Sequence, residues 1–234
     1  KYYLHFFMKR INKIYNNYIV TKPWGEEYTI FYNKNKLAVT LVKIKPKKAT
    51  SLHCHPTKKT GFIILKGSPY IQIGIHKKNT WKSKPLSILV IRPGLFHSIK
   101  NFNNSNAIVA LEFESPYLKN DLIRFKDRYG RKKKGYESKK FMKKITKNDI
   151  RFKKNKLKNV YNLYDKKIII EKIKNRKQIL RFNNKSVTAI LDGKITNNKK
   201  QTVLSYGEII KTTSLKILTK HYKINKPFLA MNVV

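Results

Sequence analysis

Short runs of alternating apolar and polar residues follow one another along the first half of the chain. The clearest run is SPYIQIGIH, in which Ile71, Ile73 and Ile75 alternate with tyrosine, glutamine and glycine. A period of two places the apolar side chains on one face of a β-strand. The runs end at turn signals such as Gly67 and the Pro-Gly pair at 93–94. Short strands at this spacing predict a closed all-β sandwich or barrel.

A charged, lysine-rich segment interrupts this pattern, after which strand signals resume. We predict strands in KKIIIEKI, KQILRF, SVTAILDGKIT, QTVLSYGEII, LKILTKHYKI and PFLAMNVV. FIILKGSPYIQIG is similar to VTAILDGKITNN, and SKPLSILVIRPG is similar to QTVLSYGEIIKT, which indicates a weak internal repeat and two barrels of one kind. The predicted organisation is an N-terminal arm (1–20), a first barrel (21–131), a basic linker (132–158) and a second β domain (159–234).

Three histidines are the most informative polar residues of the first barrel. His53 and His55 lie two apart in SLHCHPTKKTGF, so on a strand they point to one face and Cys54 points to the other. His97 follows the Pro-Gly turn in VIRPGLFHSIKN. If the two segments pair, three imidazoles converge inside the barrel. Such a set predicts a divalent metal ion, which the ligands alone do not identify among Zn, Fe, Mn and Ni.

These two segments resemble the motifs of the cupin superfamily. The first cupin motif carries HxH, then a glutamate and a closing glycine, and the second has a Pro/Gly turn followed by histidine and asparagine. The matching residues here are His53, His55, Gly67, Gly94, His97 and Asn101. The resemblance implies a double-stranded β-helix, or jelly-roll, in the first barrel and a degenerate cupin-like barrel after it, a bicupin. The second half has no histidine at the matching places.

The match departs from the cupin pattern at Thr60, where most metal cupins carry the glutamate ligand. A threonine hydroxyl is a poor metal ligand. The resemblance therefore leaves two alternatives, a three-histidine site with open positions or a site that no longer holds a metal.

Two flanking segments narrow the resemblance. KPWGEEY before the barrel and NDLIRFKDRYGR at its end are similar to the framing motifs of cupins of the mannose-6-phosphate isomerase type II group. This group includes stand-alone cupins encoded among surface-polysaccharide and nucleotide-sugar genes. The resemblance covers roughly residues 20–131 and implies an activated or phosphorylated sugar as substrate. No glycine-rich phosphate-binding loop of a guanylyltransferase is present.

Glu112 is the candidate catalytic acid or base. In AIVALEFES, Ala110, Glu112 and Glu114 share one face of the predicted strand. If this face lines the barrel, Glu112 could complete a metal site or act as a general base. The alternative is a solvent-exposed face whose acids pair with surface lysines.

Three basic residues are candidates for binding an anionic substrate. Arg124 lies in RFKDRYGR, and a guanidinium recognises phosphate or carboxylate bidentately. The alternative for Arg124 is an ion pair with Asp127 that fixes the chain over the barrel. Lys59 and Arg92 lie beside the histidine segments, where they could attract an anion, and Lys58 is expected to be solvated or to do the same.

The formal net charge is +42, from 54 Lys and Arg against 12 Asp and Glu. The accompanying abundance of Asn, Ile, Tyr and Phe favours a codon bias and a solvated surface over a nucleic-acid footprint, since no nucleic-acid-binding motif accompanies the charge. The single cysteine excludes an intrachain disulfide. No apolar stretch is long enough to span a membrane, and the start lacks the apolar core of a signal peptide, so we expect a cytoplasmic protein. A homodimer is left open.

These observations favour a metal-dependent isomerase or epimerase that acts on a sugar phosphate or nucleotide sugar. Two other classes are kept. A non-catalytic sugar-binding or regulatory cupin would explain Thr60 and the histidine-free second half. A nucleic-acid-binding protein is motivated by the net charge alone.

Overall fold

The structure is a computed structural model that describes residues 11–131, 138–154 and 157–234. The first ten residues of the predicted arm, on which the signal-peptide expectation rests, lie outside these ranges. So do the lysines at 132–134 of the predicted linker. Within the described ranges, no helix combines the length and the apolar character that crossing a membrane would require.

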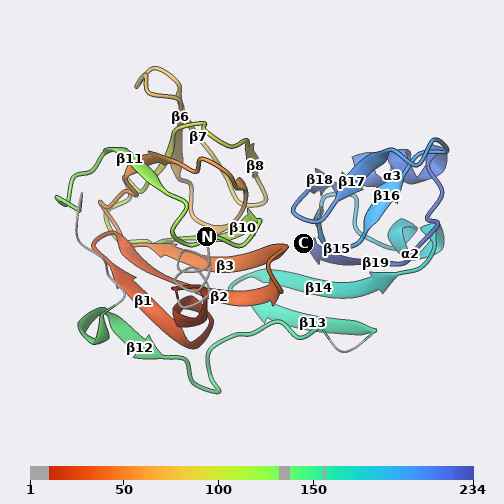
Figure 1. Cartoon of the computed structure of the whole chain (residues 1–234), viewed down its shortest axis with the longest axis horizontal. Helices are drawn as coiled ribbons and strands as arrows, with labels where there is room; N and C mark the ends of the chain where they lie inside the picture. Colours follow the sequence, from red (N-terminus) through yellow and green to blue (C-terminus); the bar gives the residue numbers. More distant parts are fainter. Residues whose placement is uncertain (1–10, 132–137, 155–156) are drawn as a thin grey trace, which may run out of the picture.

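Two antiparallel sheets form the first part of the molecule (Figure 1). In sheet order, the seven-stranded sheet consists of β12 (Met142–Lys144), β1 (Tyr18–Lys22), β2 (Gly25–Asn33), β3 (Leu37–Ile44), β10 (Ile108–Ser115), β5 (Lys59–Lys66) and β8 (Ile88–Ile91). The five-stranded sheet consists of β11 (Ile123–Lys126), β4 (Leu52–Cys54), β9 (His97–Lys100), β6 (Tyr70–Ile73) and β7 (Thr80–Lys82). This is the all-β architecture that the strand pattern predicts, and the jelly-roll that the cupin resemblance implies.

A third antiparallel sheet and two α-helices form the C-terminal part. In sheet order, its five strands are β13 (Lys158–Leu163), β14 (Lys166–Ile173), β19 (Phe228–Val233), β15 (Val187–Asp192) and β18 (Ile209–Lys211). The remaining elements are the hairpin β16 (Lys194–Thr196) and β17 (Thr202–Ser205), the helices α2 (Arg176–Leu180) and α3 (Thr212–His221), and the short 3-10 helix η1 (Lys139–Phe141). A second closed barrel is therefore not confirmed.

The central strands of the seven-stranded sheet, β3, β10 and β5, are buried on both faces. On β5, Phe62 and Ile64 belong to the core between the two N-terminal sheets. Ile63 and Leu65, which alternate with them, belong to a second core shared with strands β14, β15 and β19. The C-terminal sheet (cyan to blue in Figure 1) thus covers the outer face of the seven-stranded sheet. Because both faces are covered, β5 has a continuous apolar sequence instead of an alternating one.

Two segments predicted as strands are helices. KQILRF falls on α2, whose first turn is closed by a capping box between Asn175 and Gln178. LKILTKHYKI falls on α3, where Leu215 and Thr219 lie four residues apart and are both buried. A spacing of four places them on one face of a helix. Short apolar runs do not distinguish a buried helix from a strand, and here the capping chemistry and tertiary packing decided for the helix.

Candidate metal centre

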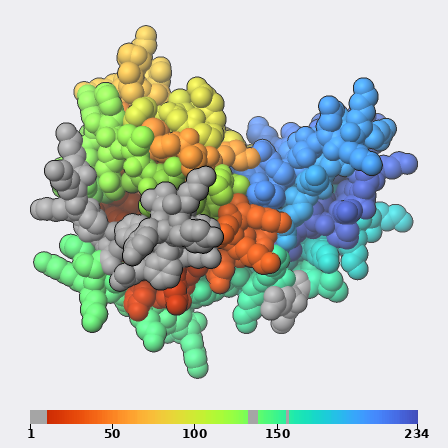
Figure 2. Space-filling view, viewed as in Figure 1, coloured from red at the N-terminus to blue at the C-terminus, as the bar shows by residue number. Residues whose placement is uncertain are grey.

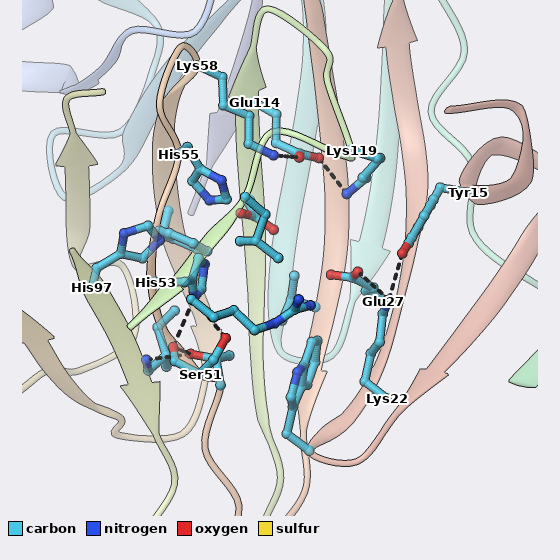
Figure 3. A pocket seen from close by; sticks show the side chains of 18 of the residues that line it. Tyr15, Lys22, Glu27, Ser51, His53, His55, Lys58, His97, Glu114 and Lys119 are labelled. Atoms are coloured by element: carbon cyan, nitrogen blue, oxygen red, sulfur yellow. Dashed lines mark hydrogen bonds and ion pairs between the residues drawn. The ribbon is translucent and has the colours of Figure 1, made fainter. Parts of the chain in front are cut away.

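The three predicted histidines come together inside the N-terminal sandwich (Figure 3). His53 on β4 is the cross-strand partner of His97 on β9, and His55 follows directly after β4. The centroid of the His53 ring lies 4.4 Å from that of the His97 ring and 5.0 Å from that of the His55 ring. One ring nitrogen from each histidine lies within 4.8 Å of the other two.

Hydrogen bonds at Nδ1 determine which nitrogen faces the centre of this cluster. His53 and His97 each bond through Nδ1 to the backbone carbonyl two residues earlier, at 2.8 and 3.1 Å. His55 Nδ1 bonds to the carbonyl of Asp121 at 2.6 Å. Because a carbonyl only accepts, Nδ1 carries the proton and the Nε2 lone pair is available. Nε2 of His55 and His97 is buried and has no hydrogen-bond partner among the described residues. This donor set fits a metal ion.

The surroundings keep the imidazoles neutral, the form that binds a metal. Burial, followed by the neighbouring Lys58, lowers the pKa of His55 to about 2. Burial also lowers the pKa of His97 to about 4. The pKa of His53 lies well below its ordinary value because of burial and the two other histidines. All three are unprotonated at neutral pH, as ligation requires.

Thr60 lies on the inward face of β5, on the side of Phe62. Its hydroxyl is buried and has no hydrogen-bond partner among the described residues. No carboxylate of the described residues joins the three histidines within the 4.8 Å group. The centre therefore offers three nitrogen donors, and the glutamate that most metal cupins add is absent from it.

The histidines form one wall of a cavity of about 120 Å³. Figure 3 shows Lys58, Glu114 and Lys119 at one end of this cavity, and Tyr15, Lys22 and Glu27 on the side away from the histidines. Arg124 and Glu112 also line it. Ionisable groups of both signs therefore face the imidazoles across a small space.

Glu112 points into the cavity, which decides between the two orientations open from the sequence. Its neighbours on β10, Leu111 and Phe113, point to the core shared with the C-terminal sheet. Burial, and then the charge of Glu114, raises the pKa of Glu112 to about 8. Glu112 has no hydrogen-bond partner among the residues that the structure describes. A carboxyl with a pKa this close to neutrality can both give and accept a proton.

Glu114 is held in the opposite state. Its carboxylate accepts hydrogen bonds from Lys58 at 2.6 Å and from Thr40 at 2.8 Å, and it pairs with Lys119 at 2.6 Å. Burial alone would raise the pKa of Glu114, but Lys119 and Lys58 together lower it well below its usual range. Two carboxyls on β10 thus differ in protonation at neutral pH, because Glu114 forms ion pairs with Lys58 and Lys119 and Glu112 forms none among the described residues.

Several cavity residues were missed by sequence reasoning. Lys58 was expected to be solvated, but it is only 3% exposed and hydrogen-bonded inside the barrel. Lys119, and the group of Lys22, Glu27 and Tyr15, were not singled out; Lys22 donates to the Tyr15 hydroxyl at 2.6 Å. The available signal was the charge of Glu114, because an inward carboxylate requires a buried cationic partner.

The three predicted substrate-binding residues have different locations. Arg124 lines the cavity and is the cross-strand partner of His53. Lys59 forms an ion pair with Glu208 of the C-terminal part, and Arg92 is exposed; neither lines the cavity. Asp127, the alternative ion-pair partner considered for Arg124, is hydrogen-bonded to Arg131, whose Nε lies 2.9 Å away. Arg131 reaches Asp127 because the turn at Gly130 brings the chain back.

The jelly-roll fold and the inward histidine cluster define the chain as a cupin. Within this class, the family described as mannose-6-phosphate isomerase C-terminal matches residues 10–127, half of the chain. The protein belongs to this family. Comparison with curated proteins gave no match.

Solved structures similar to this chain share little sequence with it. The cupin domain of Cnp3 from Schizosaccharomyces pombe is 16% identical with a TM-score of 0.36, over 39% of this chain and 64% of that one. The capsular polysaccharide assembling protein CapF from Staphylococcus aureus is 17% identical with a TM-score of 0.42, over 47% of this chain and 34% of CapF. A cupin-superfamily sugar phosphate isomerase from Silicibacter pomeroyi is 14% identical with a TM-score of 0.31, over 34% of this chain and 50% of that one. The chain therefore spans less than two thirds of each.

Proposed function

We propose that this cupin is a metal-dependent isomerase or epimerase of a sugar phosphate or nucleotide sugar. The observation that carries the proposal is the convergence of three neutral imidazoles on a cavity that also contains Glu112, a carboxyl with a pKa of about 8. Membership of the mannose-6-phosphate isomerase C-terminal family supports a sugar substrate.

His53, His55 and His97 would hold the metal ion through Nε2. A divalent cation bound there would supply Lewis acidity towards a carbonyl or hydroxyl oxygen of the substrate. Zn, Fe, Mn and Ni all accept imidazole ligands, so the donor set does not choose among them. The chain supplies no fourth protein ligand to this group among the described residues.

Glu112 is assigned the proton transfer. Isomerisation and epimerisation next to a carbonyl both require removal of a proton from carbon and its return. A carboxyl with a pKa near the working pH is suited to both directions. Glu114 cannot take this part, because Lys58 and Lys119 keep it ionised and hydrogen-bonded. Arg124 is the cavity residue assigned to the anionic group of the substrate.

The size of the cavity favours a small substrate. Pockets for drug-sized ligands measure roughly 300–1,000 Å³, and this cavity measures about 120 Å³. One sugar ring or its reacting end is the largest group we place inside, and a nucleotide would remain outside the mouth. Lys59 and Arg92 have no part in this proposal.

The proposal extends to the organisation of the chain. We assign the chemistry to the barrel at 21–131 and a structural covering role to 159–234, with 132–158 between them. Sugar phosphates and nucleotide sugars are metabolites of the cytoplasm, and the one cysteine, Cys54, is buried and free, so we place the protein there.

The test combines metal analysis with solvent hydrogen exchange. Purified protein is assayed for bound Zn, Fe, Mn and Ni, and then incubated in deuterated water with mannose 6-phosphate and a panel of nucleotide sugars. We expect about one metal ion per chain and deuterium at a substrate carbon, both lost in His53→Ala and His97→Ala. His221→Ala is the matched control, because His221 is exposed and lies in the C-terminal part. A metal-free protein whose stability ignores the two cavity substitutions would overturn the metal centre. Sugar binding without exchange would identify a non-catalytic cupin instead.

A further inference from the structure

We propose a second binding site, for a nucleoside diphosphate, where the N-terminal sandwich meets the C-terminal part. The site is a cavity of about 750 Å³, within the range of pockets that hold small-molecule ligands. It shares no lining residue with the histidine cavity. The proposal does not depend on the metal centre or on the function proposed for it.

The edges of both N-terminal sheets lie at this cavity. Strand β7 is the outer strand of the five-stranded sheet, and β8 is the outer strand of the seven-stranded sheet. The cavity lies at these two edges and is completed by Lys185, before β15, and Lys211, at the end of β18. Figure 2 shows the surface indented between the yellow segment of the N-terminal part and the blue C-terminal part.

Trp81 gives this cavity a flat aromatic surface. Its cross-strand partner on β6 is Ile71, which is 2% exposed and also lines the cavity. The indole itself is 46% exposed. A half-exposed ring over an apolar floor is suited to stacking against a nucleobase, which is tolerant of the identity of the base.

Four lysines surround this floor, two from each part of the molecule. They are Lys82, Lys84, Lys185 and Lys211, and all are exposed. Among the residues that the structure describes, none that lines the cavity is acidic. None of the four has an ion-pair partner among the described residues, whereas Lys59 pairs with Glu208 across the same junction. Lysine is abundant in this chain, so a positive charge alone would not indicate a site. The indication here is that four lysines surround an indole in a concave surface.

Leu86, in the wall of the cavity, supplies an independent observation. Its φ of 65° lies in the left-handed region that branched residues avoid. The N–H of Leu86 donates to the carbonyl of Ile64 at 2.8 Å, which holds the strained turn against β5. Strain of this kind is concentrated at binding and catalytic sites. A planar apolar surface with a cationic rim matches a nucleobase that carries phosphates. A single-stranded nucleic acid presents the same chemistry, so the experiment must separate the two.

The chain has two tryptophans, so Trp24→Phe leaves Trp81 as the only indole and its fluorescence as the reporter. The protein is titrated at 0.15 M salt with uridine diphosphate, inorganic pyrophosphate and a short oligothymidylate. We expect saturable quenching by uridine diphosphate and binding of pyrophosphate at least tenfold weaker. Calorimetry on the unsubstituted chain repeats the titration, in case Trp24→Phe disturbs the fold.

Paired lysine substitutions locate the binding. Lys82→Ala with Lys84→Ala, and separately Lys185→Ala with Lys211→Ala, should each weaken uridine diphosphate binding about tenfold, the loss expected for two exposed charge pairs. Lys77→Ala with Lys78→Ala removes the same charge from an exposed turn outside the cavity and should change binding less than twofold. The proposal fails if uridine diphosphate gives no saturable signal, if only the oligonucleotide binds, or if the control pair weakens binding equally.

Discussion

Asp121 connects the histidine cluster to the turn between β4 and β5. Its backbone carbonyl accepts the Nδ1 proton of His55 at 2.6 Å. Its carboxylate accepts the backbone N–H groups of Thr57 at 3.1 Å and Lys58 at 2.8 Å. Partners of this kind orient a metal-binding imidazole without touching the metal. Asp121 is therefore a positioning residue for His55.

Asp121→Ala keeps the carbonyl that binds His55 but removes the carboxylate that holds residue 121 against the turn. We predict that it lowers the affinity for the metal by about tenfold, the lower end of the effect of losing a partner that orients a ligand. The measurement is competition with a chromophoric chelator. Asp165→Ala is the matched control, because Asp165 is exposed and pairs with the adjacent Lys166. Equal affinity in the Asp121 and Asp165 variants would show that the backbone alone orients His55.

The raised pKa of Glu112 predicts how the stability of the folded protein depends on pH. Its pKa is about 8 in the folded protein and 4.5 as its ordinary value. Between these values the folded state binds a proton that the unfolded state has released, so stability falls as pH rises from about 4.5 to 8. Glu112→Gln removes this loss. In chelator-treated protein, its melting temperature should match wild type near pH 4.5 and exceed it at pH 8 by at least about 2–4 °C, the shift given by 1 kcal/mol in a chain of this size. A constant difference across this range would contradict the raised pKa.

At the residue scale, local sequence pattern could predict the histidines but not their charged neighbours. Because His53 and His55 lie two residues apart on a strand, their side chains point to the same face. His97 follows the Pro-Gly turn and lies on β9, the strand that pairs with β4. Lys119 reaches Glu114 from a loop, and nothing in its own neighbourhood indicates burial. Such pairs are properties of the tertiary fold, so one sequence cannot reveal them.

At the scale of elements, β10 carries two carboxyls of the cavity, Glu112 and Glu114, and ties three segments together. Through Glu114 it binds Lys58 of the turn before β5, Lys119 of the loop after β10 and Thr40 of β3. Glu114 and Lys58 are 1% and 3% exposed. A buried pair contributes little net stability as a whole, but removing one partner leaves the other charge uncompensated.

Glu114→Gln is therefore expected to destabilise the protein by about 3–5 kcal/mol, because two buried ammonium groups lose their counter-charge. Urea denaturation at neutral pH measures this. Glu26→Gln serves as the control, since Glu26 is half exposed and lies 3.5 Å from a similarly exposed Lys43; surface pairs of this kind contribute about 0–1 kcal/mol. If both variants lose the same stability, the network is not what holds these segments.

The strands were easier to predict than the helices. In the first half, alternation and turn residues act together, and SPYIQIGIH and PLSILVI both contain strands. In the second half, KQILRF has too few residues for its period to be read, and the capping residue Asn175 lies outside the apolar run. LKILTKHYKI is apolar in a pattern that fits either structure, and its helix is settled by contacts with the C-terminal core.

At the scale of the whole molecule, the C-terminal sheet and the seven-stranded sheet share one core. Ile63, Val109 and Leu111 of the first part belong to the same buried cluster as Ile170 and Met231 of the second. The C-terminal segments do form strands, but the second barrel that the weak internal repeat indicated is not confirmed. A repeat shows that two segments have similar local structure; it does not show whether each closes on itself or both bury a face against each other.

Gly61 lies against Ile209 across this junction and gives a direct test of it. A Cβ at position 61 would lie 2.6 Å from Cδ1 of Ile209, so Gly61→Val should force the two sheets apart and cost about 1–3 kcal/mol. Truncation in Ile209→Ala makes room for the added side chain, so the double variant should be more stable than the sum of the single losses by at least about 0.5 kcal/mol. Ile195→Ala, a truncation in the separate C-terminal core, should instead add to Gly61→Val without coupling. Equilibrium denaturation of the three single and two double variants gives the free energies of unfolding from which both couplings are calculated. If Gly61→Val couples equally to both truncations, or to neither, the two halves do not pack through this contact.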